Sequence, residues 1–136
     1  METRIFPAKT EELDNVLDFV NGQLEAAGCD MKSQTQISIA LEELFVNVAL
    51  YAYKAERAGG CEIAAGLADD GMFNIRIKDL GIPFDPTERD DPDITLSAEE
   101  RQIGGLGIFM VKKFMDKVTY ERDGDYNIMT IGKKIK

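Results

Sequence analysis

Two stretches of the chain carry apolar residues at helical spacing. In the first, from about Thr10 to Ala27, apolar side chains recur every three or four residues, and Gly28 ends the pattern. The second opens at Ser33, which forms a capping-box pattern with Gln36, and it continues to about Lys54. We therefore expect two amphipathic helices, each with one buried face.

Apolar and alternating runs between turn signals predict five strands. The first is short, from Arg4 to Phe6, and Pro7 stops it. The other four form two hairpins around the Asp-Gly pairs at 70–71 and 123–124. Their sequences are "CEIAAGL" and "MFNIRIKD" in the first hairpin, and "KVTYER" and "YNIMTIGKKI" in the second.

Strands joined by hairpins, with the helices grouped separately, indicate the α+β class. The expected architecture is a two-layer sandwich in which helices cover one face of a mixed or antiparallel sheet, and residues 1–136 form a single domain. From Pro86 to Gln102 the chain has few apolar residues and many charges, which predicts a long mobile loop with a short helix around Ser97 to Arg101. Loops of this length inside a compact domain are usually functional.

The charge balance excludes several classes of partner. The chain has 16 basic and 25 acidic residues, a net charge of −9, which argues against nucleic acid and against an anionic membrane as partners.

Because the chain has no histidine, it cannot form a Ser-His-Asp triad, a histidine-ligated zinc site or a phosphohistidine relay. Any general base must then be a carboxylate, a lysine, a cysteine or a tyrosine.

The expected compartment is the cytoplasm. No apolar run approaches the ~18 residues of a membrane span, and the N-terminal stretch lacks the pattern of a signal peptide. Cys29 and Cys61 are far apart and form no CxxC pair, which favours small core or surface thiols over a redox role.

The stretch "IGGLGIFMVKKFMD", residues 103–116, brings three glycines to the start of a third apolar helix. Glycine is useful where the backbone turns tightly or approaches another group closely. A helix N-terminus also presents unpaired N–H groups, which suit phosphate. The motif alone leaves two interpretations open, a phosphate-binding loop or an ordinary turn into a helix. A dinucleotide-binding unit is excluded, because the motif follows a loop where a strand would be required.

A polar pair lies at the edge of the buried stripe of the second helix. Glu43 and Asn47 are four residues apart, so their side chains are neighbours on the helix surface, whereas Glu42 falls on the far face. The pair is either part of a pocket wall or an ordinary solvated helix shoulder.

A second polar signal lies in "DLGIPFDP", residues 79–86. Asp79 continues the alternation of the apolar residues before it, so we expect its carboxylate to point into the core, where it needs hydrogen bonds. Gly81 would leave room for a flat ligand beside the backbone. Alternatively, the strand ends at Lys78 and the segment is a plain turn.

Together these three clusters resemble the N box and the two glycine boxes of the GHKL superfamily of ATPases, whose ATP-binding domain is called the Bergerat fold. The stretch "EELFVNVALYAY" is similar to the N box, "DLGIPFDP" to the first glycine box and "GGLGIFMVKKFMDKV" to the second. The resemblance covers the chain from about residue 33 to its end. The short length of the chain and the sequences of both glycine boxes look most like those of bacterial anti-sigma factor serine/threonine kinases.

The resemblance implies a role for each matching residue. Asp79 would accept a hydrogen bond from the adenine amino group, and Gly81 would let the ring approach. Asn47 would place its side-chain oxygen on Mg²⁺, and Glu43 would position and deprotonate the substrate hydroxyl. The phosphates would be cradled by Gly104, Gly105, Leu106 and Gly107, with the helix starting near the third of these.

Four further positions enter through the resemblance. Thr130 in the last strand resembles a threonine that supports the adenine site. Tyr51 and Ala52 stand where family members often have histidine and glycine, which changes the local contacts on the phosphate side. Arg101 is the candidate for an arginine of the lid.

The implied function is an ATP-dependent serine/threonine protein kinase that acts as an anti-sigma factor. It would use ATP and Mg²⁺, sequester a sigma factor and phosphorylate an anti-sigma factor antagonist of the STAS type. Homodimers are common in the resembled group. Two other functions stay open: a non-catalytic ATP-binding switch that holds a protein partner, and a simple ATPase without a protein acceptor.

Overall fold

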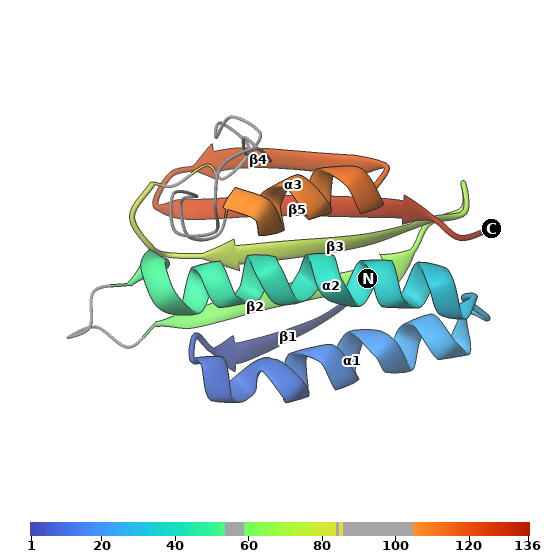
Figure 1. The fold of residues 1–136 in the computed structure, drawn as a ribbon. Coiled ribbons are helices and arrows are strands. Elements are labelled where there is room, and N and C mark those ends of the chain that lie inside the picture. The colour runs from blue at the N-terminus through green and yellow to red at the C-terminus, as the bar shows by residue number, and fades with distance from the viewer. Residues whose placement is uncertain (54–58, 84, 86–104) are drawn as a thin grey trace.

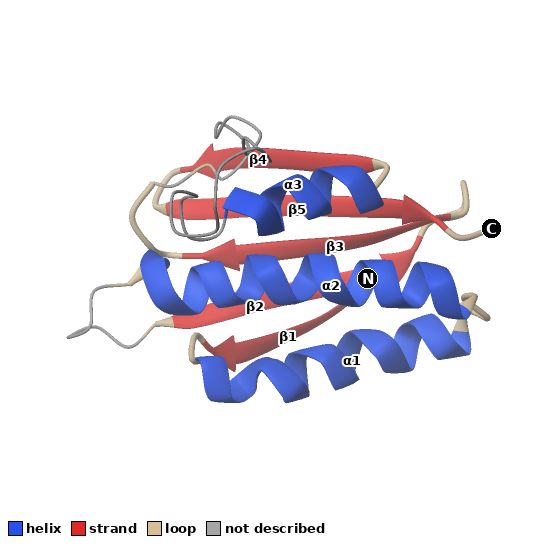
Figure 2. Cartoon of the chain, viewed as in Figure 1, coloured by secondary structure: helices blue, strands red, loops and turns tan. Residues whose placement is uncertain are grey.

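Three α-helices lie on one face of a five-stranded sheet in the computed structural model, which describes residues 1–53, 59–83, 85 and 105–136 (Figure 1). In the view of Figure 2 the helices all lie in front of the sheet. The two-layer α+β architecture expected from the sequence is therefore confirmed. The long loop expected from Pro86 to Gln102, with its short helix, lies outside the described residues.

The sheet is antiparallel throughout. Its strands are β1 (Glu2–Pro7), β2 (Gly60–Leu67), β3 (Met72–Asp79), β4 (Lys117–Asp123) and β5 (Tyr126–Lys134). Their order across the sheet is β1-β2-β3-β5-β4. Both expected hairpins form, and Gly71 and Gly124 take the positive φ values, 86° and 59°, that such turns need. β1 ends at Pro7 as expected, but it begins at Glu2, two residues before the expected start at Arg4.

The helices agree with the apolar spacing except at their ends. They are η1 (Thr10–Glu12), α1 (Leu13–Ala26), α2 (Met31–Asn47), the π-helical turn η2 (Val48–Ala52) and α3 (Gly105–Phe114). Gly28, with φ of 74°, follows the end of α1 as expected. The expected cap of the second helix is wrong: Asp30 is the N-cap, and its Oδ2 accepts a hydrogen bond of 3.1 Å from the backbone N–H of Ser33.

The core between the two layers is apolar apart from one place. Helices α1 and α2 bury residues such as Val20 and Leu41 against the sheet, which contributes Ile63, Ile75 and Ile131. Among the described residues, the buried polar side chains are Asp79 and Asn127, which are 5% and 6% exposed. A buried polar group is costly unless it is hydrogen-bonded, so this pair marks a place where the core serves something other than packing.

No helix among the described residues is long and apolar enough to cross a membrane.

Candidate functional site

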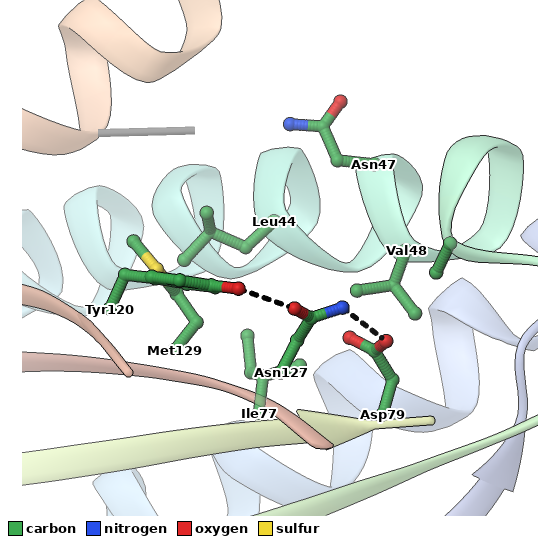
Figure 3. Close-up of a pocket in the computed structure, with 9 residues that line it drawn as sticks. Leu44, Asn47, Val48, Ile77, Asp79, Tyr120, Asn127 and Met129 are labelled. Carbon is green, nitrogen blue, oxygen red and sulfur yellow. Dashed lines mark hydrogen bonds between the residues drawn. The ribbon is translucent and has the colours of Figure 1, made fainter. Parts of the chain in front are cut away.

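A cavity with about 430 Å³ of empty space opens where the end of α2 meets the ends of β3 and β5 (Figure 3). Most of the side chains around it are apolar. The lining residues are Leu44, Asn47, Val48, Ala52, Ile77, Asp79, Tyr120, Asn127 and Met129.

Asp79 places a carboxylate at the floor of this cavity. It is the last residue of β3 and keeps the inward orientation of Ile77, so the alternative in which the strand ends at Lys78 is excluded. Its Oδ1 accepts hydrogen bonds from the backbone N–H of Gly81 at 2.8 Å and from Nδ2 of Asn127 at 3.0 Å. Among the described residues both bonds of the carboxylate end on Oδ1, which leaves Oδ2 as the atom for a donor in the cavity.

Asn127 was not predicted from the sequence, although a signal for it exists. In β5, Asn127, Met129 and Ile131 are buried at alternate positions, so the asparagine stands on the core face just as Asp79 does in β3. The two residues are paired in the register of β3 and β5. Figure 3 shows the hydrogen bonds from Asn127 to Asp79 and from Tyr120 to Asn127.

Gly81 has a structural reason besides the expected one. A methyl group at this position would overlap the backbone carbonyl oxygen of Ala52 in η2. The next residue, Ile82, donates its N–H to that same oxygen at 3.0 Å. Gly81 is therefore required by a close approach between two backbone segments, and it does not line the cavity.

Tyr53 holds the beginning of the loop that follows β3. Its Oη donates to the carbonyl oxygen of Gly60 at 2.6 Å and accepts from the N–H of Leu80 at 2.9 Å. Burial raises the pKa of this phenol above its ordinary value, and the negative charge of Asp79 raises it further. Tyr53 therefore keeps its proton at neutral pH and serves as a donor to Gly60. The pKa of the buried Cys61 thiol is also raised, by burial and by Asp79, its partner in the β2–β3 register.

The polar pair on α2 is formed as expected. Nδ2 of Asn47 lies 3.4 Å from Oε1 of Glu43, and both side chains are half-buried, whereas Glu42 is exposed on the other side of the helix. Since Nδ2 faces Glu43, the Oδ1 atom of Asn47 is turned away from it. In Figure 3 the amide of Asn47 points away from Asp79 and Asn127, so the site has two separate polar parts.

The first turn of α3 lies against Glu43. The helix begins at Gly105, close to the expected start at Leu106. A methyl group on Gly107 would overlap the carboxyl group of Glu43, so the absence of a side chain at this position lets the two helices meet there. The carboxyl group of Glu43 thus lies between Asn47 and the beginning of α3.

The sequence profile of the histidine kinase-like ATPase domain matches residues 6–133. The chain belongs to this family. The serine-protein kinase RsbW of Listeria monocytogenes is 30% identical over 129 residues, which cover 91% of this chain and 82% of the relative. The anti-sigma F factor of Priestia megaterium is 24% identical over 91 residues, 67% of this chain and 62% of that protein.

Solved structures show the same fold. A crystal structure of the RsbU and RsbW domains of Rv1364c from Mycobacterium tuberculosis matches 99% of this chain with a TM-score of 0.70 at 16% identity. A blue-light activated histidine kinase of Erythrobacter litoralis EL346 matches 79% of this chain with a TM-score of 0.59, also at 16% identity. The chain spans about a third of each of these longer proteins, 33% and 32%.

One residue expected in the site of this ATPase domain is placed elsewhere. Thr130 stands between Arg76 and Thr119 in the sheet register, and side chains alternate along β5, so it lies on the face that the helices do not cover. Thr130 does not line the cavity, and its support of the adenine site stays a prediction. The core-facing residue beside it that does line the cavity is Met129.

The structure describes only some of the other residues expected in the ATP site. Gly104 and Arg101 lie outside the described residues, while Gly105, Leu106 and Gly107 form the beginning of α3. Tyr51 is 43% exposed on η2, and the neighbouring Ala52 is buried. The described residues contain no group of three or more cysteine or acidic side chains that could hold a metal ion by themselves.

Proposed function

We propose that this chain is an ATP-dependent serine/threonine protein kinase that acts as an anti-sigma factor. Its substrate would be a serine on an anti-sigma factor antagonist of the STAS type. The observation that carries the proposal is the buried carboxylate of Asp79 at the floor of an apolar cavity, with the Glu43–Asn47 pair beside it on α2. The relatives named serine-protein kinase RsbW and anti-sigma F factor support the same activity and partners.

The cavity suits an adenine ring. Val48, Ile77 and Met129 offer apolar surface to the faces of a flat heterocycle, and burying such a ring is favourable. Oδ2 of Asp79 is an acceptor at the floor, and the exocyclic amino group of adenine is a donor. Asp79 would thus fix the base and orient the rest of the nucleotide toward α3.

Asn47 suits a hard cation together with phosphate. Mg²⁺ prefers oxygen ligands, and in nucleotide sites it is usually held by one or two protein side chains plus the phosphates themselves. The Oδ1 atom of Asn47 would be such a ligand. When bound, the ion would neutralise charge on the phosphates.

The beginning of α3 would receive the phosphates. Its first-turn N–H groups have no partners within the helix, and the helix dipole favours negative charge at this end. With a net charge of −9 the protein repels a nucleotide at long range, so these local donors matter. Glu43, between Asn47 and α3, would accept the proton of the attacking serine hydroxyl.

A transfer assay tests the proposal. The protein is incubated with Mg²⁺ and ATP labelled at the γ-phosphate, together with a purified STAS-type antagonist. We expect label on a serine of the antagonist. Binding of ATP without any labelled acceptor would favour the nucleotide-dependent switch, and release of free phosphate alone would favour a simple ATPase.

Replacing Gly107 with alanine should separate folding from phosphate transfer. The added methyl group would displace the flexible end of Glu43, so the free energy of unfolding should change by less than about 1 kcal/mol. The displaced carboxylate would leave its place beside Asn47, and transfer should fall about 10²-fold. Chemical denaturation and the labelled transfer assay measure the two effects.

The control for this variant is Gly22→Ala in α1. A methyl group there meets nothing within 4 Å, so it should stabilise the protein by about 0.5–1 kcal/mol and leave transfer unchanged. A Gly107→Ala protein that transfers phosphate at the rate of the original chain would contradict the placement of Glu43.

A further inference from the structure

Asn127 connects three segments at the floor of the cavity. It stands in β5, and its Nδ2 donates to Oδ1 of Asp79 at the end of β3. The same Nδ2 donates to the carbonyl oxygen of Ile82 in the loop after β3 at 2.8 Å. Its Oδ1 accepts from Oη of Tyr120 in β4.

The orientation of this amide is fixed at both ends. Besides Tyr120, Oδ1 of Asn127 also faces Nη1 of Arg122, at 3.2 Å. A guanidinium group can only donate, and a carbonyl oxygen can only accept. A flipped amide would set its NH₂ against Arg122 and its oxygen against both Asp79 and Ile82. The neighbours therefore allow one orientation, in which Nδ2 faces Asp79.

Arg122 also holds the loop that carries the other donor to Asp79. Its Nη1 donates to the carbonyl oxygen of Gly81 at 2.9 Å, and the N–H of Gly81 donates to Asp79. Among the described residues, both bonds to the carboxylate end on Oδ1. The rotation of the carboxylate is therefore set by β5 and by the loop, and Oδ2 is left for the ligand.

We propose that Asn127 is a positioning residue that selects the purine through Asp79. The inference rests on the proposed ATP site and adds to it the discrimination between 6-amino and 6-oxo purines. The amino group of adenine donates to Oδ2 of Asp79, whereas the 6-oxo group of hypoxanthine sets an acceptor against an acceptor. Without Asn127 the carboxylate can rotate, and this discrimination weakens.

The test compares the binding of ATP and inosine 5′-triphosphate by calorimetry in the presence of Mg²⁺. The original chain should prefer ATP. In Asn127→Ala, affinity for ATP should fall about tenfold while affinity for the inosine nucleotide stays the same, because only the amino group uses the oriented carboxylate. A purely structural role would lower both affinities by the same factor, so the ratio is the decisive quantity.

The matched control is Asn74→Ala. Asn74 is a half-buried asparagine of β3 on the other face of the sheet, paired with Gly132, and its loss should leave the ATP preference unchanged. If thermal unfolding shows that Asn127→Ala is not folded, a second variant, Arg122→Met, replaces it in the test. Arg122 is exposed, and removing its donor should lower the preference about threefold.

Each outcome decides something. An unchanged preference in both variants, or equal losses of both nucleotides, overturns the role of Asn127 and leaves the proposed function standing. If the original chain binds no ATP, the proposed function fails, and the inference fails with it.

Discussion

Replacing Glu43 with glutamine should lower phosphate transfer by about 10²–10⁴-fold, the usual contribution of a positioned general base. The amide keeps the shape of the side chain and its contact with Gly107, but it cannot accept the proton of a hydroxyl group. The affinity for ATP should change little, because Glu43 does not line the cavity that holds Asp79. Transfer of labelled γ-phosphate and a calorimetric titration with ATP measure the two effects separately.

The neighbouring glutamate provides the control. Glu42 is exposed on the opposite side of α2, so Glu42→Gln should affect neither transfer nor binding. Transfer by Glu43→Gln at the rate of the original chain would overturn the kinase mechanism. ATP binding with no phosphorylated serine or threonine acceptor would favour the nucleotide-dependent switch instead.

Replacing Asp79 with alanine should weaken ATP binding by about 1–3 kcal/mol, the usual cost of leaving a buried donor unpaired. The adenine amino group would lose its acceptor, and the donors of Gly81 and Asn127 would lose theirs. Because the last two losses also destabilise the protein, thermal unfolding must accompany calorimetry. Asp79→Asn, which keeps the volume but can set NH₂ against the amino group, should also bind ATP more weakly.

An acidic residue outside the site provides the comparison. Asp69 is exposed in the turn between β2 and β3, and Asp69→Ala should bind ATP as the original chain does. Unchanged affinity in a folded Asp79→Ala protein would rule out its role in adenine recognition.

Local pattern was enough to predict the inward carboxylate and the polar pair on α2. Alternation along a strand predicts that Asp79 faces the core, and helical spacing predicts that Glu43 lies next to Asn47; the structure shows both. The same alternation places Asn127 on the core face of β5 and Thr130 on the other face.

Features that depend on distant parts of the chain could not be predicted. The contact between Gly81 and Ala52 joins segments far apart in sequence, and no local pattern encodes it. The cap of α2 was expected at Ser33, but Asp30, three residues earlier, is also a good capping residue. Asp30 prevails because its side chain reaches the N–H of Ser33, which makes the serine part of the first turn.

The α2 helix has a consequence for how this domain can vary. Glu43 and Asn47 stand one turn apart on it. Leu44 of α2 and Val48, the first residue of η2, form part of the cavity wall. The helix pitch of about 5.4 Å therefore sets the distance between the proposed general base, Glu43, and the proposed metal ligand, Asn47. The same helix also sets how far both residues lie from the wall of the proposed adenine pocket. Loops elsewhere can lengthen, shorten or change composition to suit another partner protein, while the spacing of Glu43 and Asn47 on α2 stays the same.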